Sequence, residues 1–160
     1  MTFSGPLWNV LLATAPIFLT GSPALAFSNE CFDVEVAARI TRETPTVTPD
    51  CGPDCIVMSW PWIVDLDVRR VYFGDLENGP LTVLTVQHTY HGSRRGVHRW
   101  KLRRNTLGSF NVVRPEEGET LQRCPVGSPP AQSFFEPRDG RSLDDLRREG
   151  EGYFGPDPYA

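Results

Sequence analysis

Apolar and polar residues alternate with a period of two along much of the chain after residue 30. Because successive side chains of a strand point to opposite faces, this period predicts half-buried strands rather than helices. The first predicted strand covers residues 32–40 and places on one face Phe32, Val34, Val36, Ala38 and Ile40. Residues 41–54 are polar and contain two prolines, which predicts a loop.

The second predicted strand, 58–73, is the longest and has an irregular period. Its inward positions are Met58, Trp60, Trp62, Val64, Leu66 and Val68. The alternation slips at Arg69-Arg70 and then resumes with Val71 and Phe73, which predicts one extra residue in a β-bulge. Pro61 has no N–H to donate, so the start of this strand is expected at an edge or a bulge.

A third strand, 81–90, is expected to return through a turn at 91–96 as a fourth strand, 98–103. The fourth strand alternates sharply, with one face formed by His98, Trp100 and Leu102 and the other by Arg99, Lys101 and Arg103. A short fifth strand follows at 110–112. The sequence therefore predicts an all-β fold, a small five-stranded antiparallel barrel that closes to remove its edges.

The N-terminal segment predicts export. Residues 1–26 carry no charge and end in Ala24-Leu25-Ala26, the small-x-small pattern that signal peptidase accepts. We expect cleavage after Ala26 and a periplasmic or secreted protein, with an uncleaved membrane anchor as the alternative. The expected organisation is a signal peptide at 1–26, a β-barrel domain at 27–124 and a Pro/Gly-rich tail at 125–160.

Export changes the interpretation of the four cysteines, because an oxidising compartment favours disulfides over thiols. Of three possible pairings we expect Cys51 with Cys55, which enclose a tight turn, and Cys31 with Cys124, which bracket the strands. The alternative for the CGPDC segment is a redox site, but no helix-forming sequence follows Cys55 to lower a thiolate pKa.

The cysteines and strands together resemble netrin-like modules of the OB-fold class. The similarity rests on a cysteine before the first strand (Cys31 to Ile40), a long second strand ending aromatic-Gly (Val64 to Gly74), a third strand that opens LTVLTV, and a closing strand before the last cysteine (Phe110 to Cys124). The resemblance implies the barrel fold. It implies no inhibitory mechanism, because the Cys-x-Cys amino terminus of metalloproteinase inhibitors of this class is absent from a mature chain beginning at Phe27.

The tail differs from the barrel domain in composition. Residues 125–140 carry prolines and small residues without a period, and we expect an extended segment that wraps the barrel. Residues 143–149 predict a short helix with Ser142 as its N-cap and Gly150 as its stop. A formal G-x-G-x-x-G at Gly150, Gly152 and Gly155 has no strand before it, so it predicts no dinucleotide site, and no other motif predicts a cofactor.

Charge is distributed unevenly along the chain. Residues 27–77 carry 4 basic and 10 acidic side chains, residues 78–114 carry 7 basic and none acidic, and residues 115–160 carry 5 basic and 10 acidic. The basic block is a candidate binding site for an anionic partner such as an envelope polymer or an acidic protein, through Arg94, Arg95, Arg99, Lys101 and Arg103. Alternatively, the acidic tail or the acids of the second strand neutralise it, and surface charges are commonly paired in this way. Export and the net charge of −4 argue against nucleic acid.

All three histidines lie in or beside the same hairpin. A register that pairs Tyr90 with Gly96 would place His88 opposite His98 with His91 nearby, a possible zinc site with an open position for water. No carboxylate lies nearby in sequence, and the flanking arginines repel a cation. The sequence therefore predicts a noncatalytic binding or accessory module of the cell envelope, with a metal-dependent enzyme or a purely structural envelope protein as alternatives.

Overall fold

The computed structural model describes residues 31–47, 56–92, 95–115, 118, 120–137 and 140–160. The expected signal peptide and the expected Cys51–Cys55 bridge lie outside these residues. In chain order the elements are β1 (Cys31–Phe32), β2 (Val34–Pro45), β3 (Trp60–Phe73), β4 (Gly79–Gln87), β5 (His98–Arg104), β6 (Phe110–Val113), β7 (Gln122–Arg123) and α1 (Leu143–Phe154).

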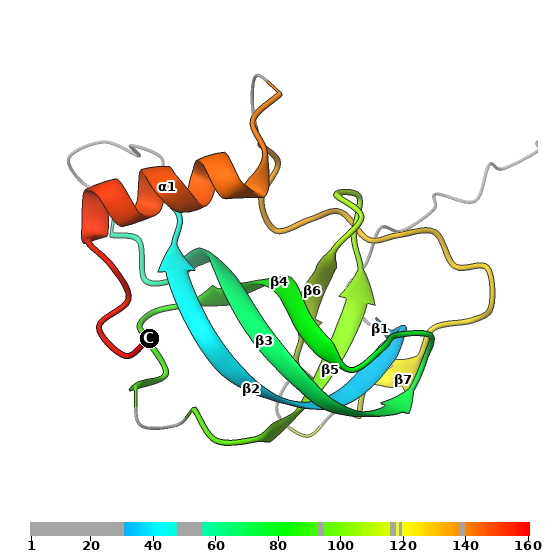
Figure 1. Ribbon diagram of the computed structural model, residues 1–160. Coiled ribbons are helices and arrows are strands. Elements are labelled where there is room, and N and C mark those ends of the chain that lie inside the picture. Colours follow the sequence, from blue (N-terminus) through cyan, green and yellow to red (C-terminus); the bar gives the residue numbers. More distant parts are fainter. Residues whose placement is uncertain (1–30, 48–55, 93–94, 116–117, 119, 138–139) are drawn as a thin grey trace, which may run out of the picture.

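Five strands form a closed barrel in the order β2-β3-β4-β6-β5, with β5 returning to β2 (Figure 1). Four of the strand pairs are antiparallel, whereas β4 and β6 run parallel. The expectation of a wholly antiparallel barrel is therefore wrong. The reason is topological: strand directions cannot alternate all the way around a closed ring with an odd number of strands, so one pair has to be parallel.

The barrel order also overturns the expected hairpin between the third and fourth strands. β4 is hydrogen-bonded to β3 and β6, and β5 to β2 and β6, so the two strands are not neighbours. The sequence suggested pairing because 88–97 contains turn residues. The turn at Asn105–Ser109 makes the actual hairpin, β5 with β6, in which Arg104 pairs with Phe110.

The barrel interior is filled by the alternating apolar residues, as the period predicts. The core contains Val34, Val36, Ala38, Ile40, Trp62, Val64, Leu66, Val68, Val83, Trp100, Leu102, Phe110 and Val112. The expected bulge is confirmed: Ala37 pairs with Arg70 and Ala38 with Val68, which leaves Arg69 as the extra residue of β3. Such bulges increase the twist that a small barrel needs in order to close.

β2 is longer than its sequence predicts. It continues to Pro45, and its last residues, Glu43 and Thr44, pair with Val64 and Ile63 of β3. The polar character of 41–45 suggested a loop, but Glu43 is fully buried because other polar groups satisfy its carboxylate.

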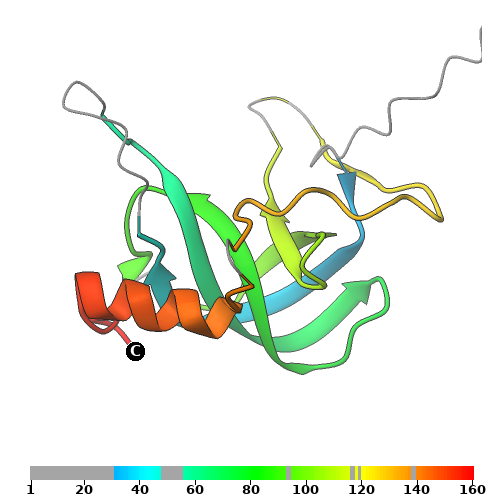
Figure 2. The same cartoon turned by 90° about the horizontal axis from the view of Figure 1, so that it is seen from above.

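A disulfide outside the barrel joins the chain before β2 to the chain after β6. Cys31 and Cys124 are bonded as expected, with their Cα atoms 4.9 Å apart, and β1 pairs with β7 beside them. Residues 125–137 then run along the side of the barrel toward α1 (Figure 2).

The C-terminal helix lies across the end of β2 (Figure 1). Ser142 caps it: its hydroxyl accepts the Asp145 N–H, and the Asp145 carboxylate accepts the Ser142 N–H. Gly150 does not end the helix, which continues to Phe154. It packs against Pro45, where a Cβ atom would collide with the Pro45 carbonyl oxygen.

Candidate functional site

Two of the predicted binding residues are held in ion pairs inside the molecule, and one lies outside the described residues. Arg95 pairs with Glu43 and Asp157, and Arg103 pairs with Asp33. Arg94 is the one that is not described. The basic block is therefore not a single exposed surface, because the structure separates its members by burial.

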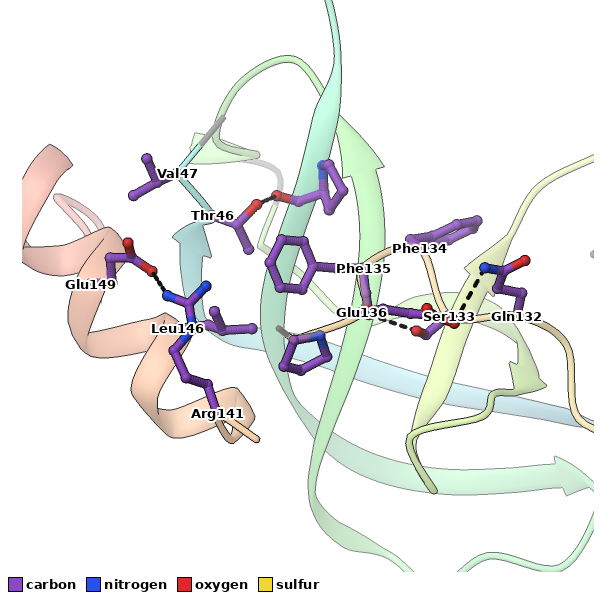
Figure 3. A pocket seen from close by; sticks show the side chains of 12 residues that line it. Thr46, Val47, Gln132, Ser133, Phe134, Phe135, Glu136, Arg141, Leu146 and Glu149 are labelled. Carbon is purple, nitrogen blue, oxygen red and sulfur yellow. Dashed lines mark hydrogen bonds and ion pairs between the residues drawn. The ribbon is translucent and has the colours of Figure 1, made fainter. Parts of the chain in front are cut away.

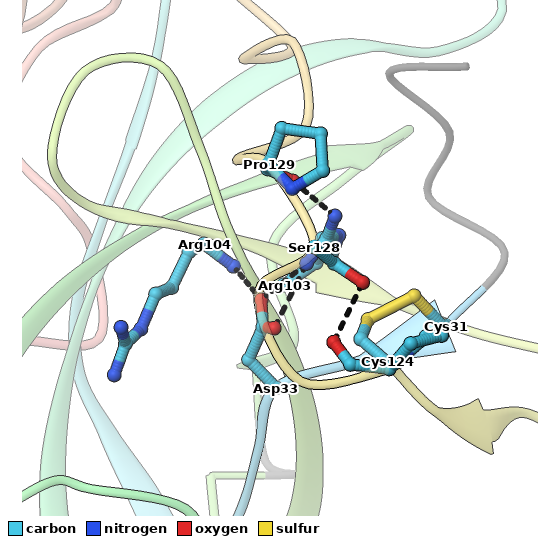
Figure 4. The surroundings of a disulfide bond; sticks show 8 residues. Cys31, Asp33, Arg103, Arg104, Cys124, Ser128 and Pro129 are labelled. Atoms are coloured by element: carbon cyan, nitrogen blue, oxygen red, sulfur yellow. Dashed lines mark hydrogen bonds and ion pairs between the residues drawn. A yellow bond between two sulfur atoms is a disulfide. The ribbon is translucent and has the colours of Figure 1, made fainter. Parts of the chain in front are cut away.

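Arg103 fastens the barrel to the disulfide region (Figure 4). It is 3% exposed, and its Nη1 donates to both carboxylate oxygens of Asp33 at 2.8 Å. The Arg104 N–H donates to the same carboxylate, and Arg103 Nη2 donates to the Pro129 carbonyl. Sequence alternation placed Arg103 on the outer face, but the extended tail covers that face at this position.

Arg99 and Lys101 line a cleft of about 270 Å³. The cleft is formed by β5, the end of β6 and His91 from the segment that precedes β5. Its cationic lining is completed by Arg114, and His91 and His98 border it. Its apolar lining consists of Trp100, Val112 and Val113. No carboxylate is among the lining residues in the described part of the chain. We call this site the basic cleft.

Local contacts orient the long cationic side chains of the basic cleft. Arg99 lies 4.2 Å from the ring centroid of Tyr72 and 3.5 Å from a carboxylate oxygen of Glu35. Lys101 lies 4.7 Å from the centroid of Phe32, and its Nζ donates to the Leu121 carbonyl at 3.3 Å. The aromatic faces add cation–π attraction, and Glu35 compensates part of the Arg99 charge.

A buried carboxylate network adjoins the basic cleft through His91, and sequence reasoning missed its centre, Glu43. Glu43 Oε1 accepts from Gln87 Nε2 at 2.8 Å and from His91 Nδ1 at 2.6 Å. Its Oε2 accepts from the His91 N–H at 3.0 Å and from Arg95 Nη2 at 2.8 Å. The sequence offers one signal for this network, the presence of His91 and Arg95 near the start of the fourth predicted strand. That signal does not indicate which carboxylate the two residues bind.

The electrostatics of this network favour an ionised Glu43. Burial alone would raise the pKa of its carboxyl, but hydrogen bonds from His91, Gln87 and Arg95 outweigh burial and lower the pKa to about 2. Burial and the nearby Asp157 and Glu43 carboxylates raise the pKa of the Tyr90 hydroxyl.

The three histidines do not converge. His88 Nδ1 lies 2.7 Å from the Met58 carbonyl, and His91 is bonded to Glu43, whereas His98 begins β5. Over the described ranges no three His, Cys, Asp or Glu side chains are grouped as metal ligands. The register that would bring His88 and His98 together requires β4 beside β5, which the barrel order does not provide.

The acidic side chains of β3 form ion pairs with arginines that do not belong to the basic block. Asp67 pairs with Arg39 and Arg69, and Asp65 accepts hydrogen bonds from Arg147 of α1 and from Thr82, both at 2.7 Å. From the tail, Asp157 reaches the basic block through Arg95. Arg95 and Arg103 are thus neutralised in buried ion pairs, whereas Arg99 of the basic cleft forms its ion pair with Glu35 at an exposed position.

A second cleft, of about 640 Å³, lies between α1, the ends of β2 and β3, and residues 132–137 (Figure 3). Phe135 and Leu146 supply its apolar lining, and Arg141 Nη1 donates to Glu149 at its rim over 2.7 Å. Ile63, Leu84 and Leu146 form a small core beneath it. This cleft marks where the helix joins the barrel.

No protein-family model matches the chain, and neither the curated proteins nor the solved structures include one with significant similarity to it. Within the described residues no helix is long and apolar enough to span a membrane.

Proposed function

We propose that the protein is an exported, noncatalytic binding module with an OB-type barrel, and that it recognises an anionic group through the basic cleft. The uncharged N-terminal segment with its Ala-Leu-Ala end supports export, and the Cys31–Cys124 disulfide is consistent with an oxidising compartment. The partner we propose is an anionic envelope polymer or an acidic protein.

The OB assignment is supported by the connectivity of the barrel. Counted along the chain, its strands follow the order 1-2-3-5-4, with the third and fifth parallel. A netrin-like variant is supported by the disulfide that links the residues before the first barrel strand to the residues after the last. Such barrels serve as scaffolds for binding, so the fold agrees with a binding role without specifying the ligand.

One observation carries the functional proposal: three cationic side chains, of Arg99, Lys101 and Arg114, line one cleft whose described lining holds no carboxylate. Carboxylate and phosphate oxygens match the forked donors of arginine. The neighbouring Trp100 and Val112 give the bound group an apolar surface to lie against. A charged group on a partly apolar chain fits this combination better than a free inorganic ion.

The test replaces Arg99, Lys101 and Arg114 by Ser and measures binding to poly-glutamate and to polyphosphate at two salt concentrations. We expect Kd to rise at least about tenfold for the preferred polymer. The salt dependence of Kd should also become weaker, since binding through fewer cationic contacts releases fewer counterions from the polymer. The two polymers distinguish a carboxylate partner from a phosphate partner.

The matched control replaces Arg39, Arg104 and Arg148 by Ser. This variant loses the same formal charge at exposed positions outside the cleft. Its binding should stay within about threefold of the wild type. Equal weakening in both variants would mean that net charge alone governs binding, and unchanged binding in the cleft variant would disprove the proposed site.

A further inference from the structure

The last residues of the chain fold back onto the loop between β4 and β5. Tyr159 lies over this loop, with its ring atom Cζ 3.5 Å from the position that a Cβ on Gly92 would take. Its ring centroid is 5.5 Å from the Arg95 guanidinium and 6.2 Å from the Tyr90 ring centroid. Glu151, at the end of α1, forms an ion pair with Arg42. The residues after α1, 155–160, are called the tail from here on. They are thus held by contacts with barrel and loop residues as well as by their connection to the helix.

Asp157 is inserted into a ready-made carboxylate site. Its Oδ2 accepts the Glu43 backbone N–H at 2.7 Å and Arg95 Nη2 at 2.5 Å, and its side chain is 1% exposed. The Tyr159 N–H donates to the other oxygen at 2.9 Å, which sets the spacing between acid and ring. Main-chain and arginine donors on one carboxylate are a common means of recognising an acidic peptide.

The aromatic half of this site is also built from the barrel. Tyr90 packs edge-on against Trp62, with ring centroids 4.8 Å apart, and Trp62 is 2% exposed. Arg95 is positioned independently of the tail, because Glu43 accepts a hydrogen bond from it. The donors for the acid and the surface for the ring are therefore both held by residues that do not belong to the tail.

We propose that this seat, formed by the Glu43 N–H, Arg95, Tyr90 and Gly92, is a recognition site for a partner's acidic peptide with a carboxylate two residues before an aromatic ring. The chain's own Asp157-Pro158-Tyr159 occupies it in cis as a built-in competitor. A partner peptide has to displace the tail, whose tether to α1 gives it a high effective concentration. Gly155, with φ of 84°, joins the tail to the helix, and displacement of the tail requires a change of backbone conformation at or after this residue.

The inference is independent of the basic cleft, so each can fail without the other. The test uses the full chain with Asp157→Asn and Tyr159→Ala, which keeps the chain length but removes the carboxylate and the ring with which the chain's own tail competes for the seat. A fluorescent peptide of sequence GPDPYA should bind this variant at least about tenfold more tightly than the wild type, whose own tail competes. The control peptide GPNPYA should bind at least about tenfold more weakly than GPDPYA, since it lacks the carboxylate.

Adding Arg95→Gln to the variant should abolish peptide binding. If the double variant does not fold, the wild-type chain titrated with about 1 mM peptide provides the second measurement, with displacement expected as shifts of the Gly92 and Arg95 amide NMR signals. Absence of these shifts, or equal binding of both peptides to a folded variant, would overturn the proposal. Reciprocal tail exchange into a stable dimer would overturn the assignment to a partner peptide.

Discussion

Glu43 Oε1 accepts a hydrogen bond from His91 Nδ1 over 2.6 Å, and these two residues lie 48 positions apart in the chain. Glu43 is fully buried at the end of β2, whereas His91 borders the basic cleft. The carboxylate thereby fixes one ring nitrogen of His91 as the donor and holds the ring in place. A buried charge in the barrel wall is tolerated because four donors from the 87–95 region surround it.

Replacing Glu43 by Gln should lower the free energy of unfolding by roughly 3 kcal/mol at pH 7, because Arg95 loses one of its two buried carboxylates. In the wild type the folded-state pKa of Glu43, about 2, lies below its ordinary value of 4.5. Its stabilisation is therefore fully present above pH 4.5 and is lost as pH falls toward about 2.

Urea unfolding of both proteins between pH 7 and pH 2 checks this prediction. The difference in stability between wild type and Glu43→Gln should shrink across the acidic range. A difference that does not depend on pH would show that the ionised carboxylate is not its source.

Gly150→Ala and Gly152→Ala should have opposite effects although both lie in α1. A Cβ at Gly150 would collide with the Pro45 carbonyl oxygen and lie 3.1 Å from Thr44 Cγ2, so we expect a loss of about 1 to 3 kcal/mol. A Cβ at Gly152 meets nothing within 4 Å, so alanine should add about 0.5 to 1 kcal/mol through helix propensity. Thermal unfolding measures both, and a neutral Gly150→Ala would contradict the close packing of α1 on β2.

Removing the disulfide by Cys31→Ser with Cys124→Ser should cost about 4 to 5 kcal/mol if the entropy of the unfolded chain dominates, because the bridge spans 93 residues. The folded barrel should persist under conditions that offset this loss, since its core cluster is separate from the small cluster that contains Phe32, the neighbour of Cys31. Urea midpoints with and without reductant measure the effect, and a loss under about 1 kcal/mol would argue against a structural role for the bridge.

Asp33→Asn should destabilise the protein by about 3 kcal/mol, because it leaves the 3% exposed Arg103 without its charged partner. Asp144→Asn is the matched control: Asp144 also pairs with an arginine, but its side chain is 74% exposed. The control should change stability by less than about 0.5 kcal/mol. Similar losses of stability in the two variants would show that the burial of Arg103 does not make its ion pair with Asp33 more stabilising than an exposed pair.

The sequence predicted those features of the barrel that depend on local alternation. The inward faces, the extra residue at Arg69 and the distant Cys31–Cys124 pair follow from periodicity, from a phase slip and from compartment chemistry. Strand neighbours are a different matter, because periodicity does not determine which edge a strand joins. For that reason the alternation over 81–104 predicts a hairpin, although β6 lies between the two strands of this stretch.

The charged residues show the same limit more strongly. Arg99 and Arg103 occupy equivalent positions in the alternation of β5, yet the first is exposed and the second is buried. The difference arises from residues 129 and 33, which contact Arg103 from distant parts of the chain. The exposure of an outward side chain thus depends on which distant segments cover it. The local alternation of apolar and polar residues does not predict that coverage.

The parallel pairing of β4 with β6 also bears on how the barrel opens. This pair has only two register partners, Val83 with Phe110 and Leu84 with Asn111, whereas β2 and β3 share ten. A ring of hydrogen-bonded strands separates most readily where the fewest bonds must break, so amide exchange by local opening is expected to begin between β4 and β6. The one parallel pair that an odd number of strands requires is therefore also the pair at which this ring is weakest.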